Sequence, residues 1–121
     1  MTKIQNTKQY DLEERTYKFA KKCRDFVNKS SKTIANIEYG KQLIRASGSQ
    51  AANYIEANES LSKKDFVHRI KICRKEAKES RLWLKLFDIK NINELIKEQK
   101  KLVQEATELT KIFGSILEKS K

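Results

Sequence analysis

The sequence predicts an all-α protein, an antiparallel up-down-up-down bundle of four helices. Its 121 residues include no proline and only three glycines, whereas an all-β chain needs many turn residues of both kinds. Four long segments repeat apolar side chains every three or four positions, which is the period of a helix with one buried face. The joints between these segments are short, and short joints favour antiparallel neighbours.

The apolar period places the four helices at residues 10–29, 34–58, 63–87 and 92–118. Residues 1–9 precede the first period and are expected to form a flexible tail. Residues 10–121 then make a single four-helix-bundle domain. A chain of this length can bury a core without disulfides or metal ions.

The apolar spacing also predicts which face of each helix is buried. The third segment has the most regular pattern, and its predicted core face contains Phe66, Ile70, Cys73, Ala77, Ser80, Leu84 and Phe87. The predicted core face of the second segment contains Ile37, Gly40, Ile44, Ser47, Ala51, Ile55 and Asn58.

Two of the joints contain the residues that commonly start a helix. Ser62, with Asp65 three positions later, is placed to cap the third helix. Leu61 is placed to pack on the first turn of that helix as a hydrophobic staple. Asn91 and Glu94 repeat the cap arrangement before the fourth helix.

The sequence indicates a cytoplasmic protein. The first residues contain no apolar segment typical of a signal peptide, and no stretch approaches the ~18 apolar residues of a membrane span. Cys23 and Cys73 lie too far apart for a metal-binding pair. Both fall on predicted core faces, so we expect them to be buried, reduced thiols.

No catalytic, cofactor or metal motif is present, so we expect a protein that is not an enzyme. His68 is the one histidine, and a lone histidine is more often a surface or packing residue. Ser47 and Ser49 flank a glycine, but they lie within a predicted helix and have no paired histidine. Glu76 and Glu79 lack the Glu-x-x-His partners of a diiron bundle, and no glycine-rich phosphate loop occurs.

The charge of the chain points to a polyanion partner. The 27 basic and 16 acidic residues give a net charge of +11, and residues 63–90 hold +6 of it. On the third helix a basic stripe covers about 120° of the helical wheel. It consists of Lys71, Arg74, Lys75, Lys78, Arg81 and Lys85. The stripe is either a nucleic-acid-binding surface or a solvated helix face.

The opposite flank of the third helix carries Ile72, Glu76, Glu79 and Trp83. Trp83 beside two glutamates, away from the core face, has two interpretations. The flank is a second contact surface, or Trp83 packs on a neighbouring helix at the edge of the bundle.

The second helix has an unusual composition. Between Gln42 and Ser62 the sequence contains no lysine and only three charged residues. Opposite the predicted core face runs a polar ladder of Gln42, Arg45, Ser49, Asn53 and Glu56.

Because a solvent-facing helix of this protein should carry Lys and Glu, we infer that the second helix is covered on both sides. A second subunit would then supply partners for the polar ladder; the alternative is an ordinary exposed polar face. Arg45 is expected to pair with Glu79 or Glu56, within or between subunits.

Two motifs in this sequence resemble those of a known family. The first motif is Gln42-Leu43-Ile44-Arg45, then Ser49, then Asn53-Tyr54-Ile55-Glu56-Ala57. The second is Phe66, then Arg69-Ile70, then Ala77-Lys78-Glu79-Ser80, then Trp83-Leu84. Over residues 10–115 the chain resembles the four-helix-bundle family encoded in intervening sequences of bacterial 23S ribosomal RNA genes.

The resemblance implies an up-down bundle assembled as a ring-shaped homopentamer. The chain is also similar to the accessory protein of diversity-generating retroelements, a basic pentamer that binds nucleic acid and a reverse transcriptase. It departs from the family pattern at Ala46, where a serine is common, and at Gln50, where an aliphatic residue is common. We expect Gln50 to alter local helix packing.

Together these observations predict a basic homo-oligomeric bundle that binds nucleic acid through its phosphates. Structured RNA is the favoured ligand. The basic stripe supplies the charge. The polar ladder, Glu79 and Trp83 form the subunit interface. The alternative is a scaffold or accessory subunit whose basic surface binds an acidic protein. Neither interpretation requires a cofactor or a membrane.

Overall fold

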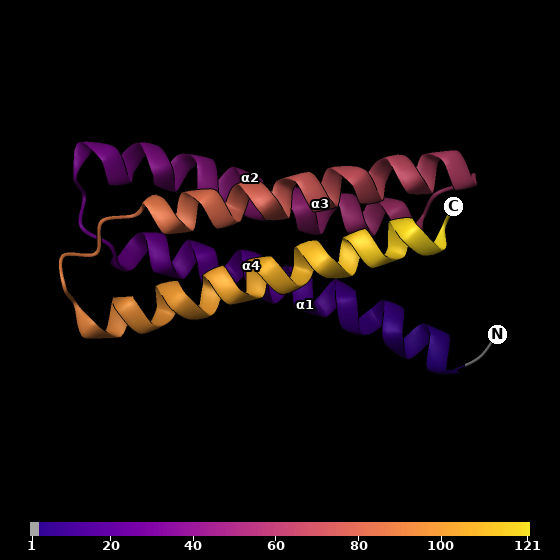
Figure 1. The fold of residues 1–121 in the computed structure, drawn as a ribbon, viewed down its shortest axis with the longest axis horizontal. Coiled ribbons are helices and arrows are strands. Elements are labelled where there is room, and N and C mark those ends of the chain that lie inside the picture. The colour runs from indigo at the N-terminus through magenta and orange to yellow at the C-terminus, as the bar shows by residue number, and fades with distance from the viewer. Residues whose placement is uncertain (1–2) are drawn as a thin grey trace.

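The structure, a computed structural model, describes the backbone of residues 3–121 and the side chains of residues 12–121. It contains the helices α1 (Lys3–Lys29), α2 (Ile34–Asn58), α3 (Lys63–Leu86) and α4 (Asn93–Lys119). Each helix packs against the next one in the chain, and α4 returns beside α1 (Figure 1). The predicted all-α up-down bundle is confirmed, and residues 3–121 contain no strand.

The predicted helix bounds agree with the structure except at the first helix. Helix α2 has the expected ends, and those of α3 and α4 differ by at most one residue. Helix α1 begins at Lys3 rather than near Tyr10, because no proline or glycine interrupts the helix there. Residues 1–2 of the expected tail lie outside the described residues, and the flexibility of residues 3–9 stays a prediction.

The predicted start of α3 is confirmed, whereas that of α4 is wrong. The Ser62 Oγ accepts a hydrogen bond from the Asp65 N–H at 3.1 Å, but Leu61 is fully exposed and forms no staple. Asn91 and its neighbour Lys90 have φ of 61° and 54°, in the left-handed region. Asn91 therefore turns the chain into α4 and does not cap the helix; Ile92 occupies the cap position without a side-chain bond.

The predicted core face of α3 is correct. Six of its seven residues are buried, and Phe66 is half-buried. Cys73 on this face and Cys23 on α1 are both free and buried, as expected. Burial disfavours the thiolate and raises the pKa of Cys73 to about 12.

The rotation of α2 differs from the prediction. Ile37, Ile44 and Ile55, placed in the core by the sequence pattern, are each more than 40% exposed. The core face of α2 is rotated by about 80°, a little less than the turn that separates one helical residue from the next. Of the predicted face only Gly40 and Ser47 are buried. The buried residues are Asn36, Gly40, Leu43, Ala46, Ser47, Gln50, Tyr54 and Ala57.

Polar contacts and a close helix approach explain this rotation. The Asn36 amide donates to the Asp88 carbonyl at 2.8 Å and accepts from the Asp88 N–H at 3.0 Å. Gly40 faces α1, where a Cβ would lie 2.9 Å from Val27 Cγ1. Nearly three turns beyond, the buried Gln50 Nε2 donates to the Thr16 carbonyl of α1 at 2.9 Å. Gln50 therefore ties α2 to α1, and its effect on the packing relative to an aliphatic residue stays a prediction.

The close approach at Gly40 makes a stability prediction. Gly40→Ala should lower the free energy of unfolding, because the overpacking cost of about 1–3 kcal/mol exceeds the helix-propensity gain of about 1 kcal/mol. Gly114→Ala is the matched control, because its Cβ would meet only Arg74 Nε at 3.8 Å. That variant should be as stable as wild type or more so. Urea unfolding followed by circular dichroism measures both; equal stabilisation by the two changes would contradict the prediction.

Candidate nucleic-acid interface and subunit contacts

All six residues of the basic stripe are exposed on α3. Two of them lie against α4: Arg81 Nε donates to Thr107 Oγ1 at 2.9 Å, and Arg74 lies beside Gly114. In the middle of α3, the stripe borders a shallow pocket of about 530 Å³. The pocket is lined by Lys71, Arg74, Lys75, Lys78, Glu79 and Leu117. The structure therefore brings the predicted stripe residues together over the seam between α3 and α4.

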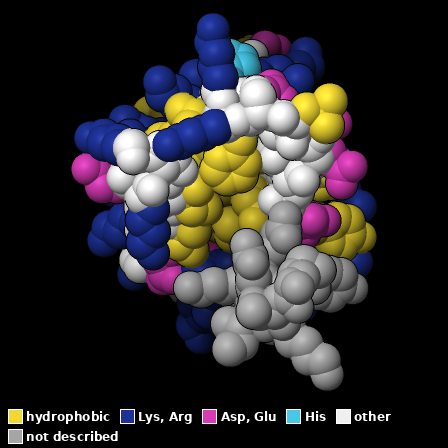
Figure 2. All heavy atoms as spheres, turned by 90° about the vertical axis from the view of Figure 1, so that its right-hand side faces the viewer, with side chains coloured by type: hydrophobic (Ala, Val, Ile, Leu, Met, Phe, Trp, Pro, Cys, Tyr) yellow, Lys and Arg dark blue, Asp and Glu magenta, His cyan; other side chains and the backbone are white. Residues whose placement is uncertain are grey.

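The stripe is electrostatically unbalanced. Among residues 12–121, none of its six cations forms an ion pair; the neighbouring Glu79 carboxylate pairs instead with Arg45. Figure 2, which views the end of the bundle where the termini lie, shows Lys and Arg side chains at the left and top of the rim around an apolar interior, with Asp and Glu side chains mainly on the right. The repulsion between these cations is relieved when a polyanion binds.

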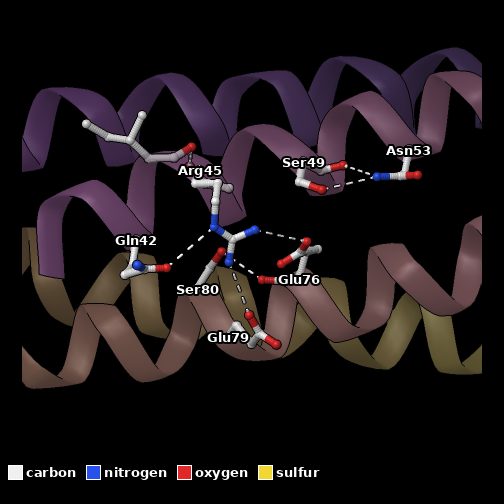
Figure 3. Close-up of polar contacts among 9 residues, drawn as sticks. Gln42, Arg45, Ser49, Asn53, Glu76, Glu79 and Ser80 are labelled. Carbon is white, nitrogen blue, oxygen red and sulfur yellow. Dashed lines mark hydrogen bonds and ion pairs between the residues drawn. The ribbon is translucent and has the colours of Figure 1, made fainter. Parts of the chain in front are cut away.

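The polar ladder of α2 faces α3 within the same chain (Figure 3). The Arg45 guanidinium lies 3.5 Å from Glu79 Oε1 and 3.5 Å from Glu76 Oε2, and its Nε donates to Gln42 Oε1 at 3.4 Å. The expected pairing with Glu79 is confirmed. Glu56 is exposed and forms no ion pair within the described part of the chain.

Glu76 is a ladder partner that the sequence analysis missed. It is only 5% exposed, and its Oε1 has no hydrogen-bond partner among the described residues. Its place in the sequence gave a signal, since it lies one residue before Ala77 and four before Ser80, both on the core face of α3. Glu76 Oε2 thus depends on Arg45, whose side chain is 54% exposed.

The rest of the ladder is also satisfied within the chain. Asn53 Nδ2 donates to the Ser49 carbonyl at 2.9 Å and to Ser49 Oγ at 3.1 Å. Asn53 Oδ1 accepts from the Arg69 guanidinium of α3 at 3.0 Å. The hydrogen bonds that we expected across a subunit contact are therefore made to α2 itself and to α3.

Trp83 packs at the edge of the bundle. Its ring stacks on Tyr39 of α2 with centroids 6.1 Å apart, and the side chain is half-buried. Of the two interpretations of this flank, the structure supports packing on a neighbouring helix.

Several isoleucines of α2 lie outside the core and form an exposed isoleucine stripe. It consists of Ile34, Ile37, Ile44 and Ile55, which are 43 to 88% exposed. Exposed Gly48 and Ala52 lie between them. The α1 side of the stripe borders a pocket of about 200 Å³ whose lining includes Val27, Ile37 and Ile44. This apolar face is the largest feature that the sequence analysis assigned to the wrong environment.

A second charged groove lies between α1 and α4, with a volume of about 590 Å³. Arg15 spans it, bonding Glu105 and Glu108 of α4 at 2.7 Å each. These partners raise the pKa of Arg15 above its usual range, the hydrogen bond to Glu105 contributing most. Nothing in the sequence pattern singled out this groove, because its cations and anions come from two separate segments.

Among the residues that the structure describes, no three His, Cys, Asp or Glu side chains are grouped so that they could bind a metal ion. His68 is exposed. None of the helices, as far as they are described, is long and apolar enough to span a bilayer.

Comparison with known proteins identifies relatives of the chain. The family model for the 23S rRNA-intervening sequence protein matches residues 8–115. The chain is also similar to a solved structure from Bacteroides thetaiotaomicron, described as a protein with unknown function from the S23 ribosomal protein family. The TM-score is 0.71 at 28% identity, over 87% of this chain and 96% of that one. No curated protein matches.

The Arg45–Glu76 contact makes a second stability prediction. Arg45→Ala should cost about 1–3 kcal/mol, because it leaves the buried Glu76 carboxylate without a cation. The additional change Glu76→Gln should recover much of that loss, since a neutral amide needs no counter-charge. Thermal and urea unfolding of the single and double variants test this coupling. Wild-type stability of Arg45→Ala would mean that the contact is only a solvated surface pair.

Proposed function

Since the chain belongs to the 23S rRNA-intervening sequence protein family, we propose that it is a non-enzymatic protein that binds nucleic acid through phosphate contacts. Structured RNA is the favoured ligand. The observation that carries the proposal is the basic stripe of α3, six exposed cations without an ion pair among the described residues. Phosphate groups neutralise such a surface and release counterions, which is the main source of affinity in non-specific nucleic-acid binding.

The proposed binding has little sequence specificity. Among residues 12–121, Tyr17 is the one aromatic side chain that is largely exposed, and it belongs to α1 rather than to the stripe. Without an aromatic platform on which bases stack, contacts to phosphates position the ligand and carry no sequence information.

We further propose that the protein forms a homo-oligomer through the isoleucine stripe. Exposed apolar residues at helical spacing favour burial against another chain over exposure to water, and Ile44 and Ile55 lie in the segment without lysine. A second copy is the proposed partner, because the family resemblance implies a ring-shaped homopentamer. In such a ring the basic stripes recur, and several weak phosphate contacts act together.

Removing charge from the stripe tests the binding proposal. The triple variant Lys71→Gln, Lys75→Gln, Lys78→Gln should bind RNA more weakly than wild type. Its log–log salt dependence should be shallower by about 2 to 3, since each neutralised phosphate contributes about 0.7–0.9. The matched control neutralises three exposed lysines at the ends of the bundle, Lys90, Lys119 and Lys121. Filter binding across a salt series measures all three proteins.

Two outcomes would count against the proposal. If the stripe variant and the end variant behave alike, the stripe is not the binding surface. If wild type does not bind RNA or DNA even at low salt, the nucleic-acid function fails, and a scaffold for an acidic protein becomes the better account.

The isoleucine stripe makes a prediction about mass. The double variant Ile44→Gln, Ile55→Gln should lower the mass measured by light scattering towards that of a monomer while its helicity persists. Leu61→Gln, an isolated exposed leucine outside the stripe, is the control and should leave the mass unchanged. A wild-type protein that is monomeric at micromolar concentration would refute the proposed assembly.

A further inference from the structure

Three lysines at the α1–α4 groove resemble the basic stripe in forming no ion pair. Lys18 and Lys22 line the groove from α1, and Lys101 lines it from α4. All three are exposed, and none forms an ion pair with a residue between 12 and 121. The other two cations of the groove are neutralised, Arg15 by Glu105 and Lys29 by Glu98. The groove thus presents two unpaired ammonium groups on its α1 wall and one on its α4 wall, beside the exposed carboxylate of Glu14, which also lines it.

The groove and the basic stripe lie on opposite flanks of α4. On one flank Thr107 bonds Arg81 of α3, and on the other Glu105 bonds Arg15 of α1. Residues 105 and 107 are two positions apart, which is about 200° around a helix axis. The exposed back of α4 between these flanks adds Lys97, Lys100 and Lys111, and the exposed glutamates of α4, Glu94 and Glu118, lie near its two ends. Helix α4 is therefore a ridge with cationic side chains on both slopes.

Helix α4 is about as wide as the major groove of B-DNA. A helix with its side chains is about 10–12 Å across. The major groove of B-DNA is about 12 Å wide, and double-stranded RNA offers a wide, shallow minor groove. The phosphates of a single strand follow one line, and single-strand binding adds aromatic stacking. Tyr17, the one largely exposed aromatic residue among residues 12–121, precedes Lys18 on α1 but does not line the groove.

We propose that the nucleic acid bound by this protein is a double helix that α4 contacts along a groove. The basic stripe of α3 meets the phosphates of one strand, and Lys18, Lys22 and Lys101 meet those of the other. This inference rests on the proposed nucleic-acid function and extends it in two ways. It adds a second binding surface from α1 and α4, and it names double-stranded nucleic acid as the ligand class.

The test compares two probes and three charge-matched variants. The probes are an RNA duplex of about 16 base pairs, the length that double-stranded RNA-binding domains span, and an unstructured oligouridine of the same length. The groove variant is Lys18→Gln, Lys22→Gln, Lys101→Gln. It is compared with the stripe variant and with the end variant described above. Fluorescence anisotropy gives the affinity of each protein for each probe across a salt series.

The groove variant should lose roughly tenfold or more in duplex affinity, with a salt slope shallower by about 2 to 3. Its affinity for oligouridine should change little, whereas the stripe variant should weaken on both probes. Melting curves check that the variants fold. Single substitutions of Lys18 and of Lys101 repeat the comparison if the triple variant does not fold.

Three results would overturn the inference. If the groove variant matches the end variant on duplex while the stripe variant is impaired, nucleic-acid binding stands but the second surface does not exist. If the groove variant loses affinity for the duplex and for oligouridine equally, the groove binds single-stranded nucleic acid rather than a duplex. If wild type binds neither probe at low salt, the proposed function fails and the inference fails with it.

Discussion

The hydrogen bonds between Asn36 and the backbone of Asp88 set the rotation of α2, and the surface of the bundle depends on that rotation. They tie the first turn of α2 to the connection between α3 and α4 at 2.8 and 3.0 Å. With Asn36 inward, the helical period also turns Leu43, Gln50 and Tyr54 inward. The same rotation leaves the isoleucine stripe at the surface, and a chain with these contacts cannot bury both apolar faces of α2.

Helix α3 carries acidic residues on one flank and basic residues on the other. Its acidic residues Glu76 and Glu79 turn towards Arg45 in the seam with α2. On its other flank only Lys75 has an acidic residue four positions away, Glu79, and that carboxylate pairs with Arg45 instead. The arrangement of charged residues on α3 thus has two consequences. It stabilises the seam with α2, and it leaves the unbalanced surface that is proposed to bind polyanions.

The proposed functions use different parts of the surface. Self-association would use α2, whereas nucleic acid would use α3, α4 and the α4-facing side of α1. Assembly through the isoleucine stripe would therefore leave the lysines exposed, and each added subunit would repeat the cationic ridge of α4. The two proposals are compatible because no residue is needed for both.

The sequence alone determined the features that depend on one helix at a time. The core face of α3, its Ser62 cap and its basic stripe follow from local spacing, because a helix fixes the angle between its own residues. The rotation of α2 was decided by tertiary contacts: Leu43 and Tyr54 form an apolar stripe one residue from that of Ile44 and Ile55. The buried Glu76 contact and the α1–α4 groove were likewise beyond the sequence, since each joins side chains from segments whose packing no local period specifies.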